Sequence, residues 1–213
     1  MLLIIAICHE KKMNIIKSDM KKLQLGRILG GITWPGEKHG FAVVVGEERL
    51  PAIGSNRYHC YLLAETEEQN TEHLLNKCAE LTGLFKVQQF YGRCHKPSMR
   101  YLDVWNRKAR DRGLPKFYLY EAPSSDVGLI EYQINILLDR LSTGYKTLHL
   151  AESQFAEYLS EVPANCISTA TDSQFPAVGA LGYAVSSLTV YPPCMEEVEE
   201  TDSWDGRDLV TGY

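Results

Sequence analysis

Carboxylate side chains at the ends of predicted elements are the residues of this chain best suited to catalysis. Glu65 and Glu121 end two predicted strands, and Asp172 lies just before the last predicted helix. Carboxylate oxygens are the ligands that Mg²⁺ and Mn²⁺ prefer, and a pair of such ions can drive phosphodiester hydrolysis. Carboxylates at the ends of elements are also commonly solvated and without function. The sequence leaves both interpretations of these three acids open.

A second candidate site is a group of basic residues in and after the helix predicted over residues 97–112. Tyr101 and Trp105 are interleaved with them. Basic side chains on one helix face can contact phosphates without reading a base sequence. The alternative is a solvated helix face that Asp103 and Asp111 partly neutralise. The candidate nucleic-acid-binding residues are Arg100, Arg107, Lys108, Arg110 and Arg112.

Two Cys–His neighbours, His59-Cys60 and Cys94-His95, have the side-chain types of a zinc site. Adjacent residues of a strand point to opposite faces, so the four side chains cannot easily converge on one ion. We therefore predict buried thiols and ordinary histidines, and no metal site.

The chain contains neither a Gly-x-x-x-x-Gly-Lys-Ser/Thr phosphate loop nor a Gly-x-Ser-x-Gly elbow. The lack of the first argues against a P-loop ATPase, and the lack of the second against an α/β-hydrolase.

Charge is spread unevenly over the 213 residues, whose formal net charge is −5. The segment from Cys194 onward contains seven acids and one arginine, so it carries −6 and the rest of the chain +1. This segment follows two prolines and lacks an apolar period, which predicts an acidic disordered tail over residues 193–213. Its apolar residues could make it a docking peptide for a partner protein; they are Trp204, Leu209, Val210 and Tyr213.

Residues 1–22 are predicted to be an extension outside a core domain of residues 23–192. Residues 2–8 form an apolar run, but a bilayer span takes about 20 residues. The run also lacks the basic leader and the cleavage site of a signal peptide. Six irregularly spaced cysteines are typical of reduced, mostly buried thiols. We therefore predict a cytoplasmic protein that makes no membrane contact.

Periodicity divides the core domain into alternating strands and helices. Three strands joined by turns come first, and Gly83 is the expected stop of the helix that follows them. A meander followed by β-α-β crossovers predicts an α/β domain with a mixed sheet and helices on both faces. This order fits the ribonuclease H-like fold, although pattern alone leaves other α/β folds open. The expected elements are strands 25–34, 41–46, 58–65, 84–91, 116–120 and 147–150, and helices 71–82, 97–112, 130–141, 155–159 and one from about residue 174.

Several segments carry a family resemblance. Residues 175–185 read Phe-Pro-Ala-Val-Gly-Ala-Leu-Gly-Tyr-Ala-Val, and residues 30–35 and 40–46 read Gly-Gly-Ile-Thr-Trp-Pro and Gly-Phe-Ala-Val-Val-Val-Gly. The first is similar to Asp-Asp-x-Val-Asp-Ala-Leu-x-Tyr-Ala, the last motif of the nuclease domain of viral large terminases, the DNA-packaging enzymes of tailed phages. The others resemble the opening Gly-Ile-Asp-Pro and second strand of that domain. Further similar segments are residues 110–115, 141–150 and 155–163.

The resemblance implies a two-metal nuclease site from which the metal ligands have been lost. In that family, Mg²⁺ or Mn²⁺ ions are held by carboxylates of the first strand, the fourth strand and the last helix. Those positions fall on Thr33, on Gln88 or Gln89, and on Gly179. A hydroxyl, an amide and a glycine supply no negative charge to offset two divalent ions. The resemblance therefore implies a degenerate active site that needs no cofactor and does not cleave DNA.

The leading hypothesis is a catalytically degenerate, prophage-derived domain linked to DNA packaging. It would bind double-stranded DNA independently of sequence, or a packaging protein through the acidic tail. One alternative is an active nuclease that uses Mg²⁺ or Mn²⁺ on the relocated acids Glu65, Glu121 and Asp172. Another is reuse of the fold for ligand or protein binding. The fold alone does not separate these alternatives, because function resides in sites.

Overall fold

The computed structural model describes residues 14–15, 24–51, 58–114, 116–123, 131–142, 147–150, 155, 158 and 171–190. The acidic tail, most of the N-terminal extension and most of the predicted helix 155–159 lie outside these residues; Phe155 and Tyr158 are both helical. Asn14–Ile15, within the predicted extension, forms strand β1 and pairs with β4.

The described strands form one mixed sheet, in the order β1-β4-β3-β2-β5-β6, with β7 paired to β4. Strands β2, β3 and β4 are antiparallel, whereas β5 runs parallel to β2 and β6 parallel to β5. The predicted α/β class and mixed sheet are therefore confirmed. The strands are β2 (Leu25–Thr33), β3 (Gly40–Pro51), β4 (Tyr58–Glu68), β5 (Gln89–Gly92), β6 (Leu119–Glu121) and β7 (Leu148–His149).

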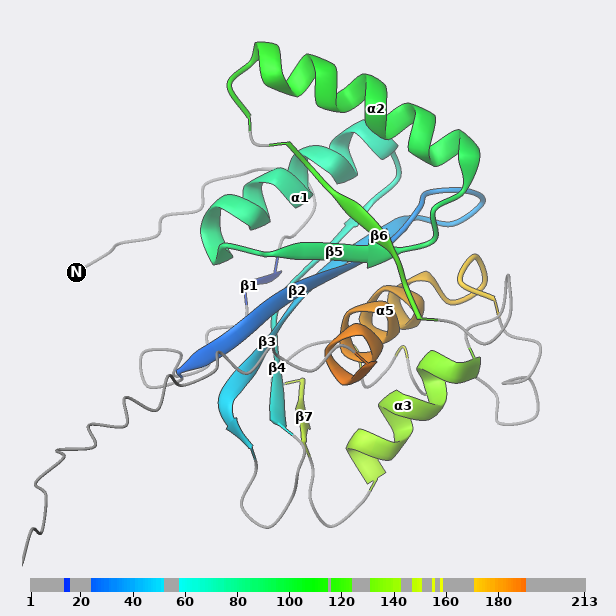
Figure 1. Ribbon diagram of the computed structural model, residues 1–213. Helices are drawn as coiled ribbons and strands as arrows, with labels where there is room; N and C mark the ends of the chain where they lie inside the picture. Colours follow the sequence, from blue (N-terminus) through cyan, green and yellow to red (C-terminus); the bar gives the residue numbers. More distant parts are fainter. Residues whose placement is uncertain are drawn as a thin grey trace, which may run out of the picture.

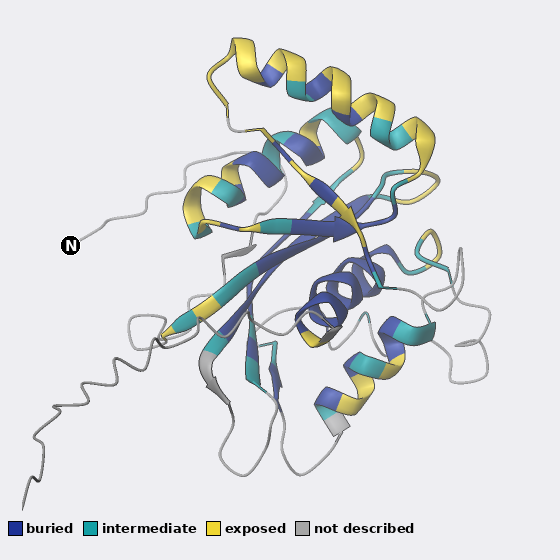
Figure 2. Ribbon diagram, viewed as in Figure 1, coloured by how far each residue is buried: buried dark blue, intermediate teal, exposed yellow. Residues whose placement is uncertain are grey.

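Helices cover both faces of this sheet (Figure 1). Helices α1 (Thr71–Phe85) and α2 (Lys96–Asp111) lie on one side, and α3 (Glu131–Ser142) and α5 (Pro176–Val190) lie on the other. The core is correspondingly divided into two clusters of buried side chains, one on each face of the sheet. Almost every residue of α5 is buried, as Figure 2 shows, because the helix is packed between the sheet and α3.

Helix α1 extends beyond the stop predicted at Gly83. It continues to Phe85 and ends where Lys86 takes the left-handed conformation, with φ 57°, and donates its N–H to the carbonyl of Thr82. Gly83 keeps an ordinary φ within the helix, because tertiary packing outweighs the modest helix penalty of one glycine. The following strand is displaced accordingly, to Gln89–Gly92 rather than residues 84–91. This displacement changes which residues lie beside the end of β2.

Candidate functional site

The carboxyl end of β2 meets the first turn of α5. Thr33 Oγ1 donates a 2.9 Å hydrogen bond to the carbonyl of Pro176 and accepts one of 3.2 Å from the backbone N–H of Phe41. A Cβ atom added to Gly179 would lie 3.1 Å from Thr33 Cγ2 and 3.2 Å from Asp172 Cβ. The structure therefore brings the first-strand and last-helix positions of the sequence analysis together, and adds Asp172 to them.

Arg93, which directly follows β5, lies beside Thr33. Strand β5 pairs with β2 in a register that places Tyr91 opposite Gly31. Two residues further along each strand, the same register places Arg93 level with Thr33. Side chains two residues apart share a face of the sheet. Arg93 therefore lies on the α5 side, beside Thr33.

The structure does not place Gln88 or Gln89 beside Thr33. Gln89 lies opposite Leu29 at the start of β5, and Gln88 precedes the strand. Four residues separate Leu29 from Thr33, which is about 13 Å along a strand. Gln88 and Gln89 lie far from Thr33 because α1 ends later in the sequence than expected. Strand β5 therefore also begins and ends later, at Gln89 and Gly92. The signal that could have indicated Arg93 was an arginine directly after a short apolar strand.

Arg93 belongs to a compact hydrogen-bonded cluster. Its Nε lies 3.2 Å from Asp172 Oδ2 and 3.0 Å from the hydroxyl oxygen of Tyr183, and that hydroxyl donates a 2.9 Å hydrogen bond to the same Asp172 oxygen. Only 5% of the Arg93 side chain and 20% of the Asp172 side chain are exposed. The Arg93 carbonyl also accepts a 2.9 Å hydrogen bond from Trp34 Nε1. A guanidinium is thus fixed at the junction of β2, β5 and α5.

The cluster holds fixed charges and is poorly suited to moving protons. Burial, followed by the neighbouring charge of Asp172, raises the pKa of Tyr183 well above its usual range. An arginine side chain stays protonated in proteins. The Asp172 carboxylate is already neutralised by Arg93, so it offers little net charge to a divalent cation. The arrangement can therefore stabilise the fold or receive an anion, but the cluster itself contains no evident base or nucleophile.

The other relocated acids have different surroundings. Glu121 ends β6, is exposed, and its Oε2 accepts a 2.8 Å hydrogen bond from the backbone N–H of Cys94. Glu65 is buried on β4 opposite Val43, and β3 separates that strand from β2. Within the described ranges, His, Cys, Asp and Glu form no group of three or more with a metal-binding arrangement. Glu121 and Asp172 flank the Arg93-Cys94 segment, and Glu65 is not part of it.

The Cys94 thiol is expected to react slowly despite being only partly buried. Burial, followed by the hydrogen bond and charge of Glu121, raises its pKa to about 12, and burial raises that of Cys60 to about 11. A raised pKa lowers the thiolate fraction at pH 8, by on the order of a hundredfold or more relative to a free thiol.

Peptide mapping after brief iodoacetamide treatment should show both Cys94 and Cys60 protected in the native protein and labelled in guanidinium. Equal labelling of Cys94 in the two conditions would contradict this environment.

The basic residues predicted to bind nucleic acid are all exposed on or just after α2. Arg107 and Arg110 line a groove of about 580 Å³ together with Lys116 and one acid, Asp103. Arg112 lines a separate hollow beside α1. Trp105 is not interleaved with them on the surface, because it is buried and its Nε1 donates a hydrogen bond to Asn76. The structure therefore assembles part of the predicted set into one concave surface.

The predicted Cys–His neighbours do not converge. His59 Nδ1 lies 2.8 Å from Nε2 of His149 on β7, and the His149 ring stacks on Tyr61 with centroids 4.6 Å apart. Cys60 is buried, and its sulfur accepts a 3.3 Å contact from the Arg140 guanidinium. Residues 94 and 95 lie at the far end of the sheet, after β5. The histidine pair was not foreseen because β7 is only two residues long and its pairing partner cannot be inferred from its own sequence.

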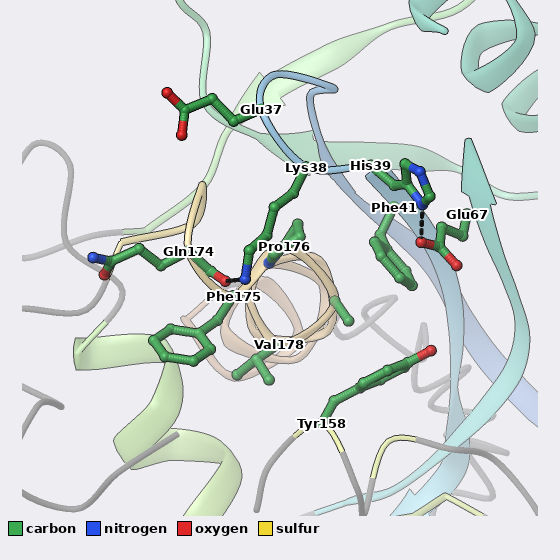
Figure 3. Close-up of a pocket in the computed structure, with 11 residues that line it drawn as sticks. Glu37, Lys38, His39, Phe41, Glu67, Tyr158, Gln174, Phe175, Pro176 and Val178 are labelled. Atoms are coloured by element: carbon green, nitrogen blue, oxygen red, sulfur yellow. Dashed lines mark hydrogen bonds and ion pairs between the residues drawn. The ribbon is translucent and has the colours of Figure 1, made fainter. Parts of the chain in front are cut away.

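A pocket of about 360 Å³ opens at the start of α5 (Figure 3). Phe41, Tyr158, Phe175 and Val178 supply apolar walls. The Lys38 ammonium lies 2.7 Å from the Gln174 carbonyl and 5.8 Å from the centre of the Phe175 ring. Further round the wall, His39 Nδ1 pairs with Glu67, and Glu37 points away from the other lining side chains. An apolar cavity whose rim carries one lysine and two glutamates suits a small organic ligand.

Comparison with known proteins adds no assignment to this geometry. No protein-family model matches the chain, and a search of curated proteins finds no significant match. Within the described part of the chain, no helix combines the length and apolar character that crossing a membrane requires.

Proposed function

We propose that this domain binds nucleic acid independently of base sequence and does not cleave it. The observation that carries the proposal is the basic surface of α2 and the segment after it. Residues 96–116 contain seven basic and two acidic residues, a net charge of +5 in a chain whose total is −5. The basic side chains named above are exposed there and partly gathered around one groove. Such a surface is suited to phosphate contacts.

The absence of cleavage is proposed from the Arg93 cluster. A two-metal nuclease needs carboxylates that attract two divalent cations. Here a buried guanidinium lies level with Thr33 and is paired to the nearest carboxylate, Asp172. A permanent positive charge at this position opposes the binding of a second cation. The active-nuclease alternative would require Asp172 to leave Arg93 and join Glu121.

The strand order, and a site at which Thr33 and Gly179 supply no carboxylate, are consistent with a ribonuclease H-like domain derived from a terminase nuclease. On that basis we propose a prophage origin, a cytoplasmic location and a role linked to DNA packaging. The partner that the resemblance implies is double-stranded DNA, or a packaging protein bound through the acidic tail. The resemblance supports these finer assignments, and the basic surface of α2 supports the binding activity itself.

Binding is tested by replacing the α2 charges and measuring the salt dependence of affinity. The triple variant Arg100→Gln, Arg107→Gln, Arg110→Gln is expected to bind a labelled 20-base-pair duplex at least about tenfold more weakly at low salt. The plot of log affinity against log salt has a negative slope, and each phosphate contact adds about one to its magnitude. The variant should therefore show a slope whose magnitude is smaller by about two to three. Lys86→Gln, an exposed lysine outside this surface, is the control and should behave as wild type.

The same preparations test cleavage. Plasmid DNA incubated with wild-type protein and Mn²⁺ should remain intact. Nicking that disappears in both Glu121→Ala and Asp172→Ala would establish the relocated-acid nuclease instead. Absence of any salt-dependent binding by wild-type protein would refute the nucleic-acid proposal.

A second candidate function is small-ligand binding, which the pocket at the start of α5 favours. Phenylacetate is a suitable probe, because its ring matches the apolar walls and its carboxylate can pair with Lys38, the lysine of the rim. Titration monitored by NMR should shift Val178 and Phe41 in wild type and leave them unmoved in Lys38→Met. Ligand binding without any DNA binding would place this function first.

A further inference from the structure

Two tyrosines form an exposed aromatic row on the edge strand β6 and the segment before it. Tyr118 is 54% exposed and Tyr120 is 42% exposed. Phe117, which precedes them, and Leu119, which lies between them, are buried. Residues two apart in a strand share a face and lie about 6.6 Å apart. The two rings are therefore presented in succession on one side of the strand, at an edge where Figure 2 shows exposed residues.

The surrounding contacts hold this row in place. Asn106 of α2 accepts a 2.8 Å hydrogen bond from the Phe117 N–H and donates one of 2.9 Å to the Phe117 carbonyl. Strand β6 is hydrogen-bonded to β5, and the Tyr120 ring lies 5.9 Å from the ring of Tyr91. Anchored aromatic rings lose little conformational entropy on binding, which suits them to stacking.

Lys116 connects the aromatic row to the basic groove. Its ammonium lies 4.8 Å from the centre of the Tyr118 ring, and it lines the groove that also contains Arg107 and Arg110. At the other end of the row, Glu121 is exposed and would repel a phosphate. The rings lie on the α5 face of the sheet, as Tyr91 does, whereas α2 covers the other face. A backbone stacked on the rings would therefore pass the edge of the sheet at Lys116 to reach the groove.

We propose that this track, defined as Tyr120, Tyr118, Lys116, Arg107 and Arg110, binds single-stranded nucleic acid in preference to duplex. The inference rests on the proposed nucleic-acid binding and names its preferred substrate class. Unpaired bases expose their faces and stack on aromatic side chains while the phosphates contact basic ones. Paired bases of a duplex are stacked on each other, so a duplex can use only the basic groove.

The test compares fluorescein-labelled (dT)20 with a labelled 20-base-pair duplex by fluorescence anisotropy at low salt. Wild-type protein should bind (dT)20 at least about fivefold more tightly, because each stacked base is worth about 1–3 kcal/mol. Tyr118→Ala and Tyr120→Ala should each lower (dT)20 affinity about fivefold or more and leave duplex affinity within about twofold. Tyr118→Phe should retain binding, because the ring is kept. Leu138→Ala, which truncates an apolar side chain 41% exposed on α3, is the matched control.

Equal affinities for the two ligands, or alanine variants that bind (dT)20 as wild type does, would overturn the proposal while leaving duplex binding by α2 intact. Loss of binding to both ligands in the tyrosine variants, with unchanged thermal stability, would also overturn it. If wild-type protein binds neither ligand, the proposed function itself fails.

An exposed edge strand can instead pair with a strand of another protein. Concentration-dependent self-association that the tyrosine variants abolish, without an effect on (dT)20, would assign the edge to such a partner.

Discussion

Arg93→Met is expected to lower the free energy of unfolding by about 2–4 kcal/mol, because it leaves a mostly buried carboxylate without its cation. The Arg93 side chain is 5% exposed and its Nε contacts both Asp172 and Tyr183. Asp172 is 20% exposed, so water can compensate part of the loss, which sets the lower end of the range. Urea unfolding should show the loss as a lower midpoint with an unchanged slope.

Arg110→Met is the matched control for this prediction. Arg110 and Asp111 also form an ion pair, of 3.9 Å, but both side chains are largely exposed, at 82% and 76%. Exposed pairs contribute little to stability, so this variant should keep the wild-type midpoint. The double variant Arg93→Met, Asp172→Asn should be more stable than Arg93→Met alone, because no buried charge is left unpaired. Equal midpoints for Arg93→Met and Arg110→Met would show that the buried cluster does not stabilise the domain.

Gly31→Ala is expected to destabilise the domain by about 3 kcal/mol, because the helix and the sheet approach each other too closely for a methyl group. A Cβ atom at this position would lie 1.9 Å from the carbonyl oxygen of Ala180 in α5. That atom belongs to the backbone of a buried helix, so it cannot move aside as a flexible side chain can. The variant should therefore unfold at a markedly lower urea concentration, or fail to accumulate as folded protein.

Gly36→Ala is the control for the glycine prediction. Gly36 is exposed in the turn between β2 and β3, and a Cβ atom there would have no neighbour within 4 Å. Its φ is not in the left-handed region, so alanine fits the backbone. The midpoint should stay within experimental error of wild type. A Gly31→Ala protein as stable as Gly36→Ala would mean that α5 does not pack on β2 as described.

The sequence was sufficient to predict the class of the fold and most of its elements. The apolar run at residues 41–46 and the helical spacing of Val178, Leu181 and Val185 each follow from local periodicity. The mixed sheet then follows from the order of strands and helices. Local patterns determine these features because each depends on which face of one element must be buried.

The candidate site was predicted only in part, because it depends on register between distant strands. Thr33 and Gly179 lie beside each other in the structure, and both belong to elements whose boundaries the sequence predicts well. Arg93 was not anticipated beside Thr33, because helix α1 continues past Gly83 and β5 begins later than expected. Trp105 was expected on the surface, but its indole packs inward. Neither the end of a helix nor the rotation of its apolar face can be fixed without the tertiary contacts that decide them.

The central claim is that a buried arginine, Arg93, occupies the junction of β2, β5 and α5, where the proposed terminase-like site would otherwise hold metal ions. Manganese-soaked crystals, measured at a wavelength where Mn²⁺ scatters anomalously, test it most directly. The account predicts no manganese peak beside Thr33 and Gly179, with the Arg93–Asp172 pair intact. Two manganese ions bound there, with Arg93 displaced and Asp172 among the ligands, would contradict it.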